Sequence, residues 1–430
     1  MDFGISKRTD VTWVEHLMIL VLLATSGFPA FMSYRFVNII FLPYILNKIN
    51  RQKGINRNHI RLIILILLIY LFVQVLYAHV SIGGLTESIL FYSTVLFEAA
   101  YIGAKFRNIY CHQILFFSII SLAFFIPIFI SPSFHDNILA LKSIIPQIGE
   151  NFNNISSNPG TNLYVVFISD AVSYVNGLYR NCGPFYEPGL FASFVSIALI
   201  INLANEKKIF NFANIVYVLT ILSTISTGGY MVLMLIVIYY VFSQDSKIYR
   251  IGLIAVLPIL LPYIYDLDFV GSKMEENLAS SSYKAYSRFG AMAYHWEKIK
   301  ESPLIGYHGG AMPNTALDSV MSSFEGRMIS PNGITWVFVY YGIPLAIIFY
   351  IYLYKSIDYL LPIYRRKWET AVIFLIFLLC AFSQTITTMP IFYLILSLAI
   401  THYKKNNTIK NYENRNNSYI SISARNGSNC

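Results

Sequence analysis

Long apolar runs separated by short polar segments make up most of this chain. A bilayer core about 30 Å thick needs about 20 apolar residues in a helix, and about 17 can suffice. The runs therefore predict about twelve membrane-spanning helices and an all-α fold, a polytopic membrane helix bundle over residues 1–404. The expected spans are residues 12–29, 31–46, 62–80, 84–104, 109–130, 188–203, 209–225, 229–242, 251–265, 333–354, 370–382 and 389–400.

Composition strengthens this interpretation. Hydrophobic residues make up 56% of the 430 residues and charged residues 12%, against about 25% in soluble proteins. The net charge of +9 lies mainly between the apolar runs, so it indicates membrane topology and excludes a nucleic-acid partner. The four cysteines have no zinc-site spacing and predict no disulfide framework.

Most basic residues lie in every second connection between the expected spans. These connections are near residues 7, 48–61, 105, 207, 247 and 355–367, and the C-terminal tail belongs to the same set. Under the positive-inside rule, this bias predicts that both termini are cytoplasmic. The two long connections, residues 131–187 and 266–332, then lie outside the membrane on the opposite side. Residues 405–430 are rich in Asn, Ser and charge, and we expect a disordered tail.

The first long loop ends in the densest polar motif, from Tyr179 to Gly189. Pro188 suits the first position of a helix, which places Glu187 at the cap beside the positive end of the helix dipole. One interpretation is an anion site with a carboxylate beside it. The alternative is that Glu187 only caps the helix and pairs with Arg180.

The second long loop contains an amphipathic segment, residues 286–298, which ends before Ser302-Pro303. Arg288 and His295 are seven residues apart and share a helical face, with aromatic residues on a neighbouring face. This face would present both side chains to a site at the membrane surface. The alternative is an interfacial helix with solvated charges.

Weaker signals accompany these motifs. Asp266 and Asp268 have the spacing of a metal-binding carboxylate pair, but a hydrated helix end is the expected role and no metal site is predicted. Residues 226–229 predict a tight turn whose small side chains pack helices closely. Ionisable residues within apolar runs are candidates for function. They are Glu15, His16, Arg35, Glu87 and Glu98.

The order of these motifs resembles the Wzy-type O-antigen and exopolysaccharide repeat-unit polymerases. The resemblance rests on Arg180, Glu187-Pro188-Gly189, the 224–229 turn, Arg288 to Gly306, and Asn332 with Tyr341-Gly342-Ile343. It implies a C-type membrane glycosyltransferase on the periplasmic face of a bacterial inner membrane. Such an enzyme transfers a growing glycan from undecaprenyl diphosphate to a new lipid-linked repeat unit.

The resemblance also implies roles for individual residues. Glu187, Arg180, Arg288 and His295 are the expected catalytic residues, with Glu187 the first choice for the base and the arginines on the lipid diphosphate. Arg327, His308, Asn332 and Tyr186 are the expected substrate-binding residues. The scheme needs no cofactor, and its partners are the lipid-linked oligosaccharide, membrane lipid, a chain-length regulator and a flippase.

Two alternatives stay open. O-antigen ligases resemble these polymerases but usually carry a His-Asn pair where the second loop enters the next span, and this chain has Pro331-Asn332 there. A lipid-linked oligosaccharide flippase would show repeat symmetry and broken helices, and the sequence shows neither.

Overall fold

The computed structural model describes most of the predicted helical segments. The described residues are 11–32, 34–51, 82–141, 160–169, 178–206, 210–244, 288–307, 332–361 and 367–401, with isolated positions at 61, 64–65, 68–69, 72, 144, 174–175 and 208. Most of the expected span 62–80, all of the span 251–265 and the C-terminal tail lie outside these residues.

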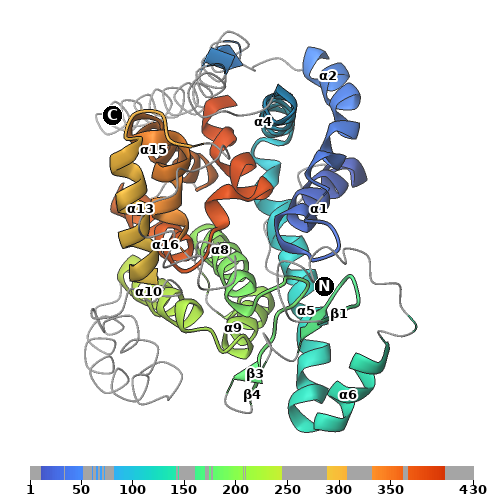
Figure 1. Cartoon of the computed structure of the whole chain (residues 1–430). Coiled ribbons are helices and arrows are strands. Elements are labelled where there is room, and N and C mark those ends of the chain that lie inside the picture. Colours follow the sequence, from blue (N-terminus) through green and yellow to red (C-terminus); the bar gives the residue numbers. More distant parts are fainter. Residues whose placement is uncertain are drawn as a thin grey trace, which may run out of the picture.

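The described part is mostly helical, and its helices follow the predicted spans (Figure 1). They are α1 (Trp13–Gly27), α4 (Ile82–Ile102), α5 (Lys105–Ile130), α8 (Pro188–Glu206), α9 (Phe212–Ser223), α10 (Thr227–Ser243), α15 (Gly333–Leu360), α16 (Lys367–Ser383) and an apolar helix over Pro390–Thr401. The expected span 31–46 is instead a 3-10 helix, η1 (Arg35–Phe41), followed by α2 (Leu42–Arg51). Among the described helices, α5, α8 and α15 are long and apolar enough to cross a membrane, and six further apolar helices have 10–17 residues.

The first long loop adds structure that an all-α fold does not include. After α6 (Pro132–Ala140), the strands β1 (Gly160–Asn162) and β2 (Phe167–Ser169) pair antiparallel, as do β3 (Tyr174–Val175) and β4 (Leu178–Tyr179). Figure 1 shows α6, β3 and β4 at the lower end of the molecule and α2 at the upper end.

Helix α8 forms the centre of the bundle. Its residues 188–204 are all buried, and it packs against α5, α9, α10 and α16. Buried tyrosines tie its surroundings together: the Tyr110 hydroxyl donates to the Phe194 carbonyl at 2.9 Å, and the Tyr217 hydroxyl donates to the Cys111 carbonyl at 2.6 Å. Each of these bonds satisfies a hydroxyl that burial would otherwise leave without a partner.

The outer faces of the surrounding helices are apolar. Large exposed side chains on α5, α9 and α15 include Phe116, Ile119, Ile126, Phe129, Ile215, Leu219, Leu222, Ile347, Ile348 and Ile351. Many exposed large apolar side chains are costly in water and typical of a surface that meets lipid or another protein. The apolar exterior and the long helices together indicate membrane association.

The helix ends separate into two groups. At one end, named here the Glu187 end, α1 finishes beside the loop before α8, because the Tyr186 amide donates to the Gly27 carbonyl at 3.1 Å. At the same end α9 finishes, since the Asn181 amide donates to the Ser223 carbonyl at 3.0 Å, and Gly333 of α15 lies against the end of α16. The segments assigned to one side of the membrane from charge therefore meet at one end of the bundle.

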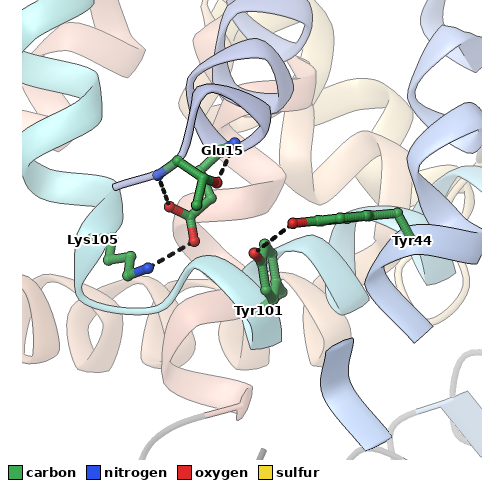
Figure 2. Close-up of polar contacts among 5 residues, drawn as sticks. Glu15, Tyr44, Tyr101 and Lys105 are labelled. Atoms are coloured by element: carbon green, nitrogen blue, oxygen red, sulfur yellow. Dashed lines mark hydrogen bonds and ion pairs between the residues drawn. The ribbon is translucent and has the colours of Figure 1, made fainter. Parts of the chain in front are cut away.

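At the opposite end, named the Lys105 end, a buried ion pair joins two helices (Figure 2). Glu15 is 1% exposed, and its Oε1 accepts from the Lys105 ammonium at 2.8 Å while its Oε2 accepts from the Thr12 amide at 2.8 Å. The Tyr44 and Tyr101 hydroxyls lie 3.3 Å apart beside it. Thr12 also caps α1, so this carboxylate completes a capping box and an ion pair at once.

Helix α15 is interrupted at Gly342, so the expectation that the spans contain no broken helix was wrong at this position. This glycine has φ +75°, and a Cβ there would lie 2.5 Å from the Leu304 carbonyl oxygen. Gly306, with φ +71°, approaches equally closely, because its Cβ would lie 2.5 Å from the Gly342 nitrogen. The turn that follows α13 (Arg288–Glu301) thus inserts into the break. The Ile343 amide donates to the Pro303 carbonyl at 2.7 Å, replacing a hydrogen bond that the break removes.

Candidate functional site

The loop before α8 folds into the bundle instead of remaining at its surface. The Asn181 amide side chain donates to the Ser121 and Ser223 hydroxyls at 3.1 and 2.9 Å and accepts from the Gly183 amide at 2.9 Å. Gly183 has φ +55°, and a Cβ there would lie 2.5 Å from the Phe191 ring. Phe185 is fully buried and stacks on the Phe194 ring at 4.7 Å. This packing fixes the positions of the polar residues on both sides of Phe185.

Glu187 lies immediately before α8, as the sequence predicts. Its carbonyl accepts from the Phe191 amide at 3.2 Å, and its carboxylate Oε1 accepts from the Gln384 amide at 3.0 Å. The carboxylate is half-buried at the positive end of the most deeply buried helix. Within the described part of the chain, no ion pair joins this carboxylate to an arginine.

Three helix N-termini meet around this carboxylate. A Cβ on Gly189, in the first turn of α8, would lie 3.3 Å from the hydroxyl of Ser226, which caps α10. A Cβ on Gly333, which begins α15, would lie 2.6 Å from the Gln384 carbonyl oxygen. Residues 226–229 do not form the predicted tight turn, because Ser226 caps α10 and residues 227–229 are its first helical turn. Their small side chains pack helices closely as expected, with Gly229 against Ala192 of α8. Converging N-termini favour bound negative charge because each carries about half a positive charge.

Arg180 is 9% exposed, and its Nε donates to the Thr224 carbonyl at 3.3 Å. Burial lowers the pKa of its guanidinium, while the negative charge of Glu187 raises it. Even a lowered arginine pKa leaves the guanidinium charged at neutral pH. Arg180 and Glu187 are therefore electrostatically coupled without forming a contact ion pair.

Arg288 begins α13, far along the chain from Arg180, and it also lies within the field of Glu187. Burial lowers the pKa of the Arg288 guanidinium, and the charge of Glu187 and the hydroxyl of Tyr186 raise it. Burial raises the pKa of Tyr186, as does Glu187, while a hydrogen bond with Thr385 and the charge of Arg288 lower it. The structure thus brings Arg180, Tyr186, Glu187 and Arg288 together at one end of the bundle.

His295 faces in a different direction from the one predicted. The buried stripe of α13 is Ala291, Tyr294, His295, Lys298 and Ile299, whereas Trp296 is 57% exposed. His295 packs on the Trp336 ring, and its Nδ1 lies 2.6 Å from the Thr335 hydroxyl. Burial lowers the pKa of His295 to about 4, so the imidazole is neutral at pH 7. His295 contacts α15 and is not presented to the surface, because Tyr294 and Ile299 place the apolar face of α13 on that side.

The predicted substrate-binding residues are only partly described. Asn332 is buried and caps α15, with its carbonyl oxygen accepting from the Ile334 and Thr335 amides at 3.0 and 3.2 Å. His308 and Arg327 lie outside the described residues.

The ionisable residues within the apolar runs differ in their surroundings. Glu15 forms the ion pair with Lys105, and Glu87 is exposed. Glu98 is fully buried, and neither of its carboxylate oxygens has a hydrogen-bond partner in the described structure. The described residues contain no group of three His, Cys, Asp or Glu side chains with metal-site geometry, and Asp266 and Asp268 fall outside them.

Sequence reasoning missed two residues of this cluster, Gln384 and Thr385. Gln384 holds the Glu187 carboxylate, and Thr385 bonds Tyr186. Both belong to the short polar turn between the expected spans 370–382 and 389–400. That turn was the available signal, because polar residues between two closely spaced spans need a partner or water.

We name the cluster formed by Arg180, Tyr186, Glu187, Arg288 and Gln384 the outer cluster. Its positive charges exceed its single carboxylate, and three helix N-termini add to them. It can hold an anion with more than one negative charge against two guanidinium groups. No protein-family model, curated protein or solved structure matches the chain, so these contacts alone characterise the site.

Proposed function

We propose that this chain is a multi-pass protein of the bacterial inner membrane that polymerises lipid-linked oligosaccharide repeat units on the periplasmic face. The observation that carries the proposal is the outer cluster, in which Gln384 holds the Glu187 carboxylate at 3.0 Å and the buried Arg180 donates to the Thr224 carbonyl at 3.3 Å. Arg288 lies close enough for the charge of Glu187 to raise its pKa. The two arginines come from the two long loops, so their convergence is not a consequence of sequence proximity.

The orientation follows from the two ends of the bundle. Basic residues lie at the Lys105 end, where Arg107 donates to Asn205 at 2.7 Å and Lys105 pairs with Glu15. The positive-inside rule assigns this end to the cytoplasm. The Glu187 end is then periplasmic, at the face where lipid-linked repeat units are joined in such a pathway. Both termini are cytoplasmic in this orientation.

The chemistry assigns a role to each part of the cluster. The leaving group is a lipid diphosphate, and guanidinium groups stabilise its developing charge through paired hydrogen bonds. Glu187 acts as the base on the acceptor sugar hydroxyl, and Gln384 orients its carboxylate. Tyr186 contributes a hydroxyl beside both charges. The glycan passes from one diphosphate to the acceptor hydroxyl, whose proton leaves with the base, so no cofactor is needed.

A ligase is the second candidate, and one observation favours it. Ligases of the related type carry a His-Asn pair at the start of the helix after the second loop. Here His295 contacts Thr335 in the first turn of α15, which Asn332 caps. A histidine and an asparagine thus come close in space although they are not adjacent in sequence.

Deletion of the gene, followed by gel analysis of surface polysaccharide, separates the candidates. A polymerase deletion leaves caps that carry a single repeat unit, and expression of the wild-type chain restores the ladder. Complementation with Arg288→Lys should leave single-repeat caps although the protein reaches the membrane at its normal level. Long glycan stranded on the carrier lipid would instead indicate a ligase, and loss of all outside-facing repeat units a flippase.

A further inference from the structure

A lateral cavity runs along α1 and opens away from the core of the bundle. Its volume is about 710 Å³, which is within the range of sites for small molecules, about 300–1,000 Å³. Its walls come from α1, η1, α5 and the β1–β2 connection. The apolar lining includes Leu20, Val21, Phe28, Phe31, Phe116 and Phe117.

The cavity is open along the apolar exterior of the bundle. Phe31 is 36% exposed and Phe116 is 54% exposed, and both line it. A molecule therefore enters sideways from the surrounding hydrocarbon and does not cross the polar ends. Only an apolar chain gains free energy by leaving lipid for such a surface, through close contact with fixed side chains.

One end of the cavity adjoins the outer cluster. Phe28 lines the cavity, and its ring packs edge-on against Phe185 at 5.1 Å. The next residue along the chain, Tyr186, donates its amide to Gly27 at 3.1 Å and precedes Glu187. A single layer of side chains thus separates the cavity from the loop that carries the proposed catalytic carboxylate.

The other end of the cavity is polar. His16 and His112 lie there, and the Gln113 side-chain amide donates to the His16 carbonyl at 2.6 Å. This end is close to the ion pair of Glu15 with Lys105. An apolar chain that starts beside the outer cluster meets apolar and aromatic walls first and polar groups last, so the cavity has a direction.

We infer that this cavity binds the polyprenyl chain of the lipid-linked substrate while the outer cluster holds its diphosphate. The inference rests on the proposed function, because the diphosphate site fixes one end of the lipid. The aromatic walls suit a chain with regularly spaced double bonds and methyl branches, which presents more contact points than a saturated acyl chain. Binding of the polyprenyl chain then increases the affinity for the substrate without changing the chemical step. Loss of this binding should therefore raise KM and leave kcat unchanged.

The test compares repeat units on diphosphates that carry a long polyprenyl chain or a ten-carbon chain. With purified wild-type protein, we expect the KM for the long-chain substrate to be at least about tenfold lower. Val21→Trp, which fills the cavity, should raise the long-chain KM to that of the short-chain substrate without changing the short-chain kcat. Leu17→Trp, an exposed position one turn earlier on α1 that does not line the cavity, should behave as wild type. Equal effects of both variants on both substrates would overturn the inference.

A binding measurement keeps the inference testable if neither substrate is elongated, an outcome that counts against the proposed function alone. A long-chain polyprenyl diphosphate with a photoreactive group in its tail should label peptides of α1 and α5 in the wild type and in Leu17→Trp, but not in Val21→Trp. Labelling elsewhere would contradict the assigned site. Equal labelling of the same peptides by a phosphatidylethanolamine with the same photoreactive group would also contradict it, since the cavity would then be a general acyl-chain site.

Discussion

The two ends of the bundle each hold a carboxylate near basic side chains, but the carboxylates are bonded differently. At the Lys105 end, both oxygens of Glu15 accept bonds of 2.8 Å, from Lys105 and Thr12. At the Glu187 end, the carboxylate accepts from the neutral side chain of Gln384, and Arg180 influences it without contact. A carboxylate whose oxygens are already paired stabilises the fold. The Glu187 carboxylate, bonded to a neutral amide beside Arg180, is placed to act on a ligand instead.

The largest expected effect is on activity at the Glu187 end. Arg180→Lys and Arg288→Lys each remove a planar fork that lysine cannot replace. Each should cost about 2–4 kcal/mol of transition-state stabilisation, roughly a hundredfold or more in kcat/KM. The measurement is elongation of lipid-linked repeat units by purified protein. Lys300→Ala, at an exposed position of α13, is the control and should keep wild-type activity. Full-length polymer from both arginine variants would mean that the Glu187 end, like the Lys105 end, serves the fold and not catalysis.

The next effect is on stability at the Lys105 end. Glu15→Gln leaves Lys105 without its buried partner and should lower the free energy of unfolding by about 2 kcal/mol, less than for a fully buried pair because Lys105 is 33% exposed. Elongation activity should persist below the lowered Tm. The matched control is Glu297→Gln, whose partner Lys300 is 54% exposed, and it should change stability by less than about 0.5 kcal/mol. Equal Tm values for Glu15→Gln and wild type would show that the ion pair of Glu15 with Lys105 does not stabilise the fold.

A smaller effect is expected from the hydrogen bond between the Glu187 carboxylate and the neutral Gln384 side chain. Gln384→Leu removes one hydrogen bond to Glu187 and should cost about 1 kcal/mol, a several-fold decrease in kcat with little change in Tm. Thr388→Val is the control in the same turn, because its hydroxyl bonds only the local carbonyl of Thr385. If the two variants lose activity equally, the turn acts through its conformation and not through Gln384.

The smallest effect concerns how α13 is held, since this helix carries Arg288. The pKa of His295 falls from 6.5 to about 4 on folding, so its contribution to stability is complete above pH 6.5 and is lost as the pH falls toward 4. Between pH 7 and pH 6 this should remove about 0.7 kcal/mol of stability. His295→Gln can still bond Thr335 but does not titrate, so its Tm should fall less over the same pH range. Identical pH dependence in the two proteins would mean that His295 protonates freely in the folded state.

Local sequence patterns predicted the ends of the helices well. Pro188 and the apolar run after it placed the start of α8 at the observed residue. The tight turn predicted at residues 226–229 was misplaced: the chain turns at residues 224–225, and Thr227 already begins α10. Arg180 and Glu187 were predicted together because they share one loop. The contact between Glu187 and Gln384 was not predictable, since it joins residues 197 positions apart and depends on how α8 and α16 pack. The buried face of α13 was predicted wrongly because polar and apolar residues occur on both faces of that helix.

The paired glycines at the break in α15 place a constraint on related sequences. A Cβ on Gly306 would meet the Gly342 nitrogen, and a Cβ on Gly342 would meet the Leu304 carbonyl, so a side chain at either position displaces the inserted turn. Neither position gains from being glycine alone, because the insertion of the turn requires both. The two residues should therefore change together among homologous proteins, and a protein that replaces one should have an uninterrupted helix and a differently placed α13. Comparing the two columns in an alignment of relatives would identify which of them keep Arg288 in position.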